Sequence, residues 1–266
     1  IGTPAFILFG WLSDKIGRKP IILAGCALAI VSYFPLFQAL TGAANPALAE
    51  AQARAPVVVA TQEQSCSFQF DPVGKNKFDT TACDIAKAAL AKAGVPYATS
   101  AVASGTTVSI GGTALPMPEP AGLAPVDKAA AITAFQKELG AALAAAGYPA
   151  KADPARVDKV RVVLILLALV LLVTMVYGPI AALLVELFPS RIRYTAMSLP
   201  YHIGNGWFGG FLPTIAFALV AASGDIYAGL WYPIAVAALA LVVGLLFLPE
   251  TYKRVVTHFE PDDPRP

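Results

Sequence analysis

Long apolar runs alternate with short charged breaks at both ends of this chain. The runs at 20–40, 162–185, 195–222 and 226–248 contain no Asp, Glu, Lys or Arg. A helix needs about 20 apolar residues to cross a bilayer, so each run is long enough to be a transmembrane helix. The apolar run at 1–10 is too short alone. We expect it to be the end of an earlier span in a longer protein.

The composition agrees with this pattern. The chain has 266 residues, of which 57% are hydrophobic and 14% charged, whereas soluble domains carry about 25% charge. We therefore expect an all-α polytopic membrane protein, with the lipid bilayer as its surroundings. The formal net charge of +2 gives no indication of nucleic acid as a partner.

The basic residues of the short breaks lie, by the span count, on one side of the membrane. They are Lys15, Arg18, Lys19, Arg191, Arg193, Lys253 and Arg254. Short loops rich in Lys and Arg stay in the cytoplasm, which sets the orientation. The predicted organisation is the end of a span, a cytoplasmic loop and a second span at 1–41; an extracytoplasmic insertion at 42–158; three spans at 159–250; and a cytoplasmic tail at 251–266.

The insertion differs in composition from the rest of the chain, being rich in Ala, Pro, Gly, Thr and Ser. Residues 84–93 and 126–146 have helical patterns, and 97–110 contains the Thr, Val and Ser typical of strands. A segment of this length can bury a core, so we expect a mixed α/β domain. One interpretation makes it a solute-binding or sensing module on a membrane anchor.

Three cysteines are present. Cys66 and Cys83 lie in the insertion and Cys26 in a span. An extracytoplasmic location is oxidising, so a disulfide between Cys66 and Cys83 is expected, with two free buried thiols as the alternative. A zinc site needs about four ligands. The two histidines, His202 and His258, lie far from the cysteine pair along the chain, so we predict no metal and no cofactor.

The first break reads GWLSDKIGRKP from Gly10. Gly10 and Gly17 allow a tight turn and a close helix approach. Asp14 can face a helix N-terminus, where negative charge is favoured, and Arg18 offers a planar fork to a carboxylate. Such contacts suit a gate that opens on the cytoplasmic side. The alternative is a simple basic anchor at the membrane surface.

Two further breaks supply charges to the same membrane face. Glu186 precedes Arg191 and Arg193, and Glu250 follows the last span. Opposite charges at a half-dry helix end should pair. We expect Arg18 to approach Glu186, and Glu250 to approach Arg191 or Arg193. The alternative is that all of these are solvated loop charges.

The span at 195–222 contains polar groups at bilayer depth: Tyr201, His202 and Asn205. Polar residues inside spans are candidates for a substrate pathway, and an interhelical hydrogen bond that holds the fold is the alternative for His202. Gly206 and Gly210 lie four residues apart, a spacing suited to close helix packing. The same pair could instead loosen the helix.

These motifs resemble the major facilitator superfamily. The break at 10–20 is similar to its cytoplasmic loop signature, 186–194 to the loop after its tenth helix, and 248–251 to the end of its last helix. Residues 198–213 resemble the eleventh helix of the metabolite:proton symporters, which carry shikimate, α-ketoglutarate, citrate, and proline or betaine. The resemblance covers 1–42 and 160–255, and the insertion departs from it.

The resemblance implies the C-terminal half of a transporter of the bacterial inner membrane. It implies proton-coupled symport of a small organic acid or zwitterionic osmolyte by alternating access. The partners would be that substrate, protons and the missing N-terminal half of the transporter. A sugar or drug carrier of the same superfamily is an alternative. An enzyme is not expected, because the sequence has no nucleophile elbow, phosphate-binding loop, metal cluster or paired carboxylates.

Overall fold

The computed structural model describes residues 2–62, 65–73, 75–189 and 191–252. The chain divides into two compact units. The helical unit comprises 1–33, 164–211 and 233–266, and the lobe unit comprises 34–163 and 212–232. Most of the predicted cytoplasmic tail, with Lys253 and Arg254, lies outside the described residues.

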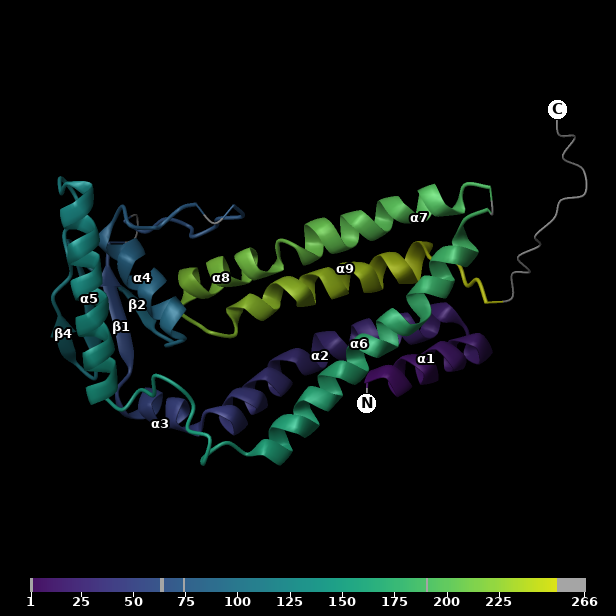
Figure 1. Ribbon diagram of the computed structural model, residues 1–266, viewed down its shortest axis with the longest axis horizontal. Helices are drawn as coiled ribbons and strands as arrows, with labels where there is room; N and C mark the ends of the chain where they lie inside the picture. The colour runs from purple at the N-terminus through teal and green to yellow at the C-terminus, as the bar shows by residue number, and fades with distance from the viewer. Residues whose placement is uncertain (1, 63–64, 74, 190, 253–266) are drawn as a thin grey trace, which may run out of the picture. The chain divides into compact units, whose positions relative to one another are not determined.

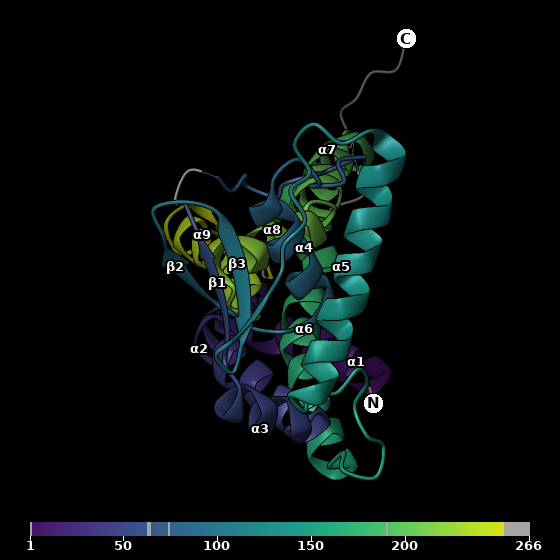
Figure 2. The same cartoon turned by 90° about the vertical axis from the view of Figure 1, so that its left-hand side faces the viewer.

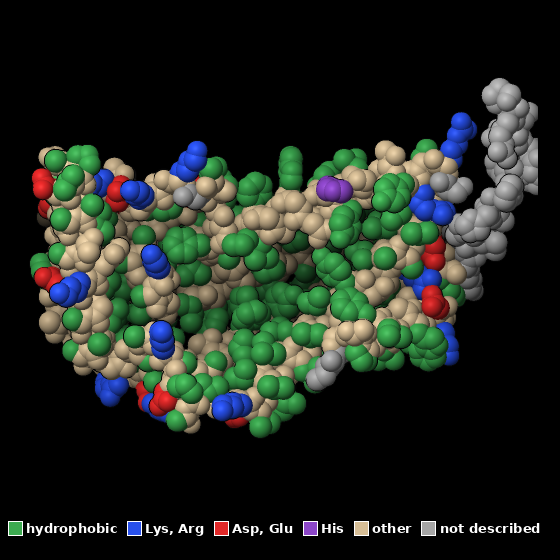
Figure 3. Space-filling model, in the orientation of Figure 1, with side chains coloured by type: hydrophobic (Ala, Val, Ile, Leu, Met, Phe, Trp, Pro, Cys, Tyr) green, Lys and Arg blue, Asp and Glu red, His purple; other side chains and the backbone are tan. Residues whose placement is uncertain are grey.

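Four helical segments are long and apolar enough to cross a membrane, and they fall on the four predicted runs. They are Arg18–Ala44, Lys159–Leu187, Arg193–Ser223 and Ala228–Phe247. The first is helix α2, the second is α6, and the last ends in α9 (Trp231–Phe247). Figure 3 shows hydrophobic side chains over much of the visible face of these helices, as expected for surfaces in contact with lipid.

Glycines bring the helices of the helical unit close together. A Cβ at Gly178 of α6 would lie 3.3 Å from Phe9 Cβ in α1 (Gly2–Ile16). A Cβ at Gly25 of α2 would lie 2.8 Å from Val176 in α6, and one at Gly244 of α9 would meet a leucine of α2. Small residues allow membrane helices to approach in this way.

The third span is interrupted, which the sequence pattern did not predict. It consists of α7 (Arg193–His202), a π-helical segment η1 (Ile203–Gly209) and α8 (Leu212–Ser223). The N–H of Gly210 donates to the carbonyl of Asn205, five residues back, at 3.1 Å. Glycine has a low helix propensity, so this glycine-rich stretch can leave the α-helical pattern. Such π-helical turns often occur at functional sites.

The insertion folds as a four-stranded sheet with helices, as the sequence predicted. The strands are β1 (Val57–Thr61), β2 (Ala98–Ala101), β3 (Thr106–Ile110) and β4 (Thr113–Leu115). Their order is β2-β1-β3-β4. Strands β1 and β2 are parallel, and the other pairs are antiparallel. The helices are α3 (Pro46–Arg54), α4 (Ala82–Ala93) and α5 (Pro125–Ala145).

One face of the sheet forms the core of this lobe. Val59 and Val108 are paired across β1 and β3 and are fully buried. They pack with Leu90 of α4 and with Phe135 and Leu139 of α5. Figure 2 shows both helices to one side of the strands. The apolar stripe predicted on the second helix of the insertion therefore faces the core.

The lobe is docked on the C-terminal end of α8, within the same unit. The Tyr97 hydroxyl donates to the carbonyl of Ala221, and the Tyr97 N–H donates to the carbonyl of Gly224 at 3.0 Å. Lys87 Nζ donates to the carbonyl of Ala222 at 3.3 Å. The last carbonyls of a helix lack partners inside it, so these groups from the lobe cap α8. Burial lowers the pKa of Lys87, although Asp84 partly opposes the shift.

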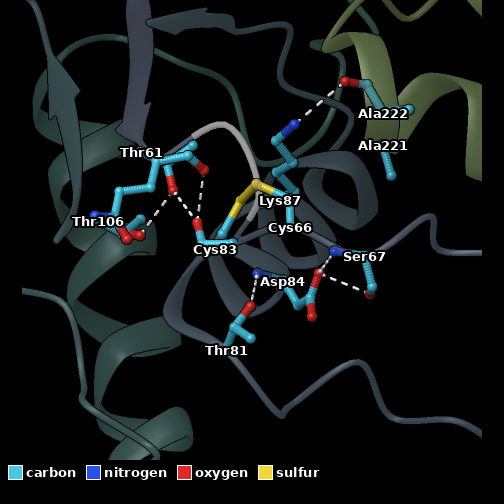
Figure 4. Close-up of a disulfide and its surroundings, with 12 residues drawn as sticks. Thr61, Cys66, Ser67, Thr81, Cys83, Asp84, Lys87, Thr106, Ala221 and Ala222 are labelled. Atoms are coloured by element: carbon cyan, nitrogen blue, oxygen red, sulfur yellow. Dashed lines mark hydrogen bonds between the residues drawn. A yellow bond between two sulfur atoms is a disulfide. The ribbon is translucent and has the colours of Figure 1, made fainter. Parts of the chain in front are cut away.

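The expected disulfide joins Cys66 to Cys83, whose Cα atoms are 5.3 Å apart. Figure 4 shows it beside the first turn of α4, where the Thr81 hydroxyl accepts from the N–H of Asp84. A bridge over a sequence separation of 17 residues stabilises a fold by about 3 kcal/mol in the chain-entropy model. Cys26 is a buried free thiol in α2.

Candidate functional site

Arg18 is the centre of a charged cluster at the break between α1 and α2. It is 7% exposed, although it begins a long helix that has no charged residue after Lys19. Its guanidinium pairs with Asp14 and donates to Ser13 Oγ at 2.6 Å. Ser13 in turn donates to the carbonyl of Gly10 at 2.6 Å. The four residues of the first motif therefore make one hydrogen-bonded chain.

Glu186 at the end of α6 is the second partner of Arg18, as the sequence predicted. Arg18 Nη2 lies 3.0 Å from Glu186 Oε1, and Nε lies 3.4 Å from Oε2. The Thr251 hydroxyl donates to Glu186 Oε2 at 2.6 Å. The Arg18 guanidinium thus binds both oxygens of the Glu186 carboxylate. The segment after α9 contacts the same carboxylate through Thr251.

Glu250 has a different role from the one predicted. Its carboxylate accepts the backbone N–H of Arg18 at 2.9 Å and of Lys19 at 3.1 Å. The first N–H groups of a helix have no partners within it and carry partial positive charge. Glu250 therefore caps α2. The predicted partners of Glu250 were charged side chains only, so these backbone donors were not considered.

The protonation of Glu250 follows from this capping. Burial disfavours its charged form, but backbone N–H groups of Arg18, Thr251, Tyr252 and Lys19 together lower the pKa of Glu250 below its usual value. A lowered carboxyl pKa means that the cap contributes stability at neutral pH and loses it as the pH falls through that pKa.

Arg191 and Arg193 lie apart from the cluster, which corrects the predicted pair with Glu250. Arg193 Nε donates to the carbonyl of Phe188 at 3.2 Å. Arg191 is exposed. Among the described residues, neither arginine forms an ion pair with Glu250. Arg193 thus donates a hydrogen bond to a backbone carbonyl of the bend that follows α6.

The two glycines of the first motif differ in role. Gly17 joins α1 to α2 with φ of 111°, and a Cβ there would lie 2.5 Å from Glu250 Oε2. It therefore allows both the turn and the cap. A Cβ at Gly10 would meet nothing within 4 Å. The close approach that we expected at Gly10 is made from the facing helix, by Gly178.

Asp14 also has a partner that the sequence did not assign. We expected Asp14 to face a helix N-terminus, but it pairs with Arg18 one turn further on. The Asp14 side chain remains 62% exposed. It can therefore still accept a bond from another segment.

A second polar group lies at the junction of α7 and η1. His202 Nδ1 is 2.7 Å from the carbonyl of Ser198. A carbonyl only accepts, so this contact is a hydrogen bond when Nδ1 carries the hydrogen. His202 is exposed, as is Tyr201.

Asn205 connects this junction to another span. Its Nδ2 donates to the carbonyl of Tyr201 at 3.0 Å, and its Oδ1 accepts from the Tyr177 hydroxyl of α6 at 3.0 Å. The sequence analysis missed Tyr177. A hydroxyl inside a span dense in Leu and Val is the signal that could have identified it.

Gly206 and Gly210 do not pack against a helix in the described structure, which corrects the expected close contact. Both are exposed, and a Cβ at Gly206 would meet nothing within 4 Å. Gly210 instead belongs to the π-helical turn, because its N–H reaches Asn205. Of the two interpretations of this pair, the described residues favour the loosened helix.

Comparison with known proteins identifies similar sequences for part of the chain. Residues 132–262 match the family described as "Sugar (and other) transporter". The chain is 36% identical over 74 residues to the glycine betaine/proline/ectoine/pipecolic acid transporter OusA of Dickeya dadantii, covering 28% of this chain and 14% of that protein. It is 38% identical over 85 residues to a putative metabolite transport protein of Haemophilus influenzae, covering 32% of this chain and 19% of that protein. The matched segment thus spans less than a fifth of the length of either relative. No solved structure matches at a comparable level.

Proposed function

We propose that this chain, whose residues 132–262 match a transporter family, is the C-terminal part of a secondary transporter of the major facilitator superfamily. It works by alternating access together with an N-terminal half. The cargo is a small organic acid or a zwitterionic osmolyte, moved with protons across a bacterial inner membrane. The name of the Dickeya relative, which includes glycine betaine and proline, supports this class of cargo.

The observation that carries the proposal is the buried charge cluster. Arg18 holds Glu186, while Thr251 and Glu250 bring the segment after α9 to the same place. Three breaks that are far apart in the sequence are thereby tied together by groups that can separate without breaking any covalent bond. We infer that this cluster is a cytoplasmic gate, which is intact when the cytoplasmic side is closed and parts when it opens.

His202 is the proposed proton carrier of this half. It is the only Asp, Glu, Lys, Arg or His within the four apolar runs of the sequence. Because Nδ1 is occupied by the Ser198 carbonyl, an incoming proton would bind Nε2 and turn the ring into an imidazolium. The adjacent π-helical turn and the Tyr177–Asn205 bond place this ring in a polar, irregular stretch of the span.

We expect His202→Gln to uncouple transport from protons. Glutamine can hydrogen-bond but does not titrate. Uptake driven by an imposed proton gradient should fall by about tenfold or more, the range in which positioned proton transfer acts. Exchange of labelled for unlabelled substrate at equal pH should persist. The matched control is His258→Gln, since that histidine follows the last apolar run. Equal loss of exchange and of gradient-driven uptake would assign His202 a structural role.

The proposed topology is tested by labelling from one side. We expect Ser104→Cys in the lobe to react with a membrane-impermeant maleimide outside cells, and Lys15→Cys to react only after the membrane is opened. Both positions are exposed. The protein that receives these reporter cysteines needs only one other substitution, Cys26→Ala, because Cys66 and Cys83 are joined in a disulfide. Labelling of Lys15→Cys in intact cells would contradict the orientation.

A second candidate function rests on the lobe. A polar cavity of about 350 Å³ is lined by residues that include Ser67, Thr81 and Asp84. A solute-binding or sensing module would need such a cavity. We rank this function second, because the Arg18 cluster has no part in it.

A further inference from the structure

We propose that residues 67–73 of the lobe form an interfacial arm that inserts Phe68, Phe70 and Val73 into the bilayer surface on the lobe's side. The arm would hold the lobe against lipid, in addition to its contact with α8. The proposal needs the lobe to stand next to a membrane, and it does not depend on what is transported.

The apolar side chains of the arm are exposed. Phe68 is 59% exposed, Phe70 40% and Val73 68%. The two phenylalanine rings are stacked, with centroids 6.5 Å apart. Most large apolar side chains of the sheet and of helices α4 and α5, by contrast, fill the lobe core, and Val126 at the start of α5 is an exception. An apolar surface concentrated on one short segment marks an interaction site rather than a scattered exposure.

This exposure is imposed by the fold. Gln69, between the two phenylalanines, is 2% exposed, and its Nε2 donates to the carbonyl of Asp84 at 2.8 Å. Ser67 donates its N–H and its hydroxyl to Asp84 Oδ1, at 2.8 and 2.9 Å. The N–H of Phe70 donates to the carbonyl of Phe68 at 2.8 Å, so the chain makes a tight turn at the inward Gln69, and Phe68 and Phe70 on either side of it are left exposed. The Cys66–Cys83 disulfide fixes the same end of the arm to α4.

The arm extends from the lobe in the direction that contact with a membrane requires. The lobe docks on the C-terminal end of α8 through Tyr97 and Lys87. That end closes the candidate span Arg193–Ser223. Figure 1 shows the segment that follows β1 projecting from the lobe back along the direction of α8. A lobe held at the end of a span with an arm directed along that span brings the arm to the bilayer surface.

The chemistry of the arm fits lipid. Aromatic side chains concentrate at membrane interfaces, and lysines placed beside them reach the phosphate headgroups. Lys75 and Lys77 follow the aromatic pair and are exposed. Asp71 is engaged in a turn, where it accepts the N–H of Val73 at 3.1 Å and of Asn76 at 2.6 Å. The exposed groups of the arm are thus mainly apolar, and two exposed lysines follow just beyond it.

Fluorescence quenching tests this contact on the complete protein in vesicles of phosphatidylcholine and phosphatidylglycerol. Trp11, Trp207 and Trp231 are replaced by Phe, and Phe68→Trp supplies the reporter. Val126→Trp is the control, since Val126 is 79% exposed in the first turn of α5 and is not part of the arm. Acyl chains brominated near the headgroup should quench Phe68→Trp several-fold more than Val126→Trp. Acrylamide in water should show the reverse order.

Two outcomes would overturn the proposal. Equal acrylamide quenching of both reporters, without quenching by brominated lipid, would mean that the arm lies in water. Protection of Phe68→Trp from both quenchers would mean that another part of the protein covers it. If Phe68→Trp does not yield folded protein, Phe70→Trp gives the same readout from the neighbouring ring of the stacked pair.

Discussion

Glu186→Gln is expected to lower transport by the complete protein about tenfold or more, with a smaller effect on its amount in the membrane. Arg18 and Glu186 have side chains that are only 9% and 13% exposed. Removing the Glu186 charge takes one carboxylate partner from the buried Arg18 and leaves it Asp14. Loss of one partner by a buried polar group costs about 1–3 kcal/mol. Each 1.4 kcal/mol is a factor of about ten in the population of the closed state. Initial uptake rates, divided by the protein found in the membrane, measure the effect.

The matched control for this variant is Glu50→Gln. Glu50 pairs with Arg156 at 2.5 Å, but those side chains are 58% and 44% exposed. Exposed pairs contribute little, so transport should stay close to that of the unmodified protein. The double variant Arg18→Glu with Glu186→Arg should regain part of the activity. The recovery is partial because the carboxylate introduced at position 18 would then face Asp14. If Glu186→Gln transported normally, the cluster would not be a gate, and its charges would serve only to orient the protein in the membrane.

Gly17→Ala should be as harmful, through the backbone. At φ of 111°, an L side chain is strained, which costs about 1–3 kcal/mol. The new methyl group would also stand 2.5 Å from Glu250 Oε2 and displace the cap of α2. We expect a lower melting temperature in detergent together with a large loss of uptake.

Gly10→Ala is the comparison for this variant. Gly10 lies inside α1, and a Cβ there meets nothing. Alanine is the better helix former, so stability should be unchanged or slightly raised. If the two variants melt at the same temperature, the role assigned to Gly17 is wrong.

Sequence reasoning succeeded where a rule links distant positions. Pairing of opposite charges from distant breaks predicted the contact between Arg18 and Glu186, which the structure shows. Two cysteines in a segment that should be extracytoplasmic predict the Cys66–Cys83 bridge. Glu250 was misassigned because its partners are backbone N–H groups, which no residue letter displays.

The other features that were not predicted depend on local geometry. Strand β1 and helix α3 were not predicted, since neither Val57–Thr61 nor Pro46–Arg54 has a long periodic pattern. The glycines of η1 were visible, yet glycine permits packing, bending and a π-helical turn alike. Only the bond from Gly210 to Asn205 decides among these.

Uptake by the complete protein in proteoliposomes tests the central claim most directly. Labelled organic acids and zwitterionic osmolytes, with proline and glycine betaine among them, are offered under an imposed inward proton gradient. The account predicts that at least one accumulates above its external concentration and that a protonophore abolishes the accumulation. Binding of these solutes by the lobe, with no gradient-dependent uptake of any of them, would contradict the account and favour a membrane-anchored binding module.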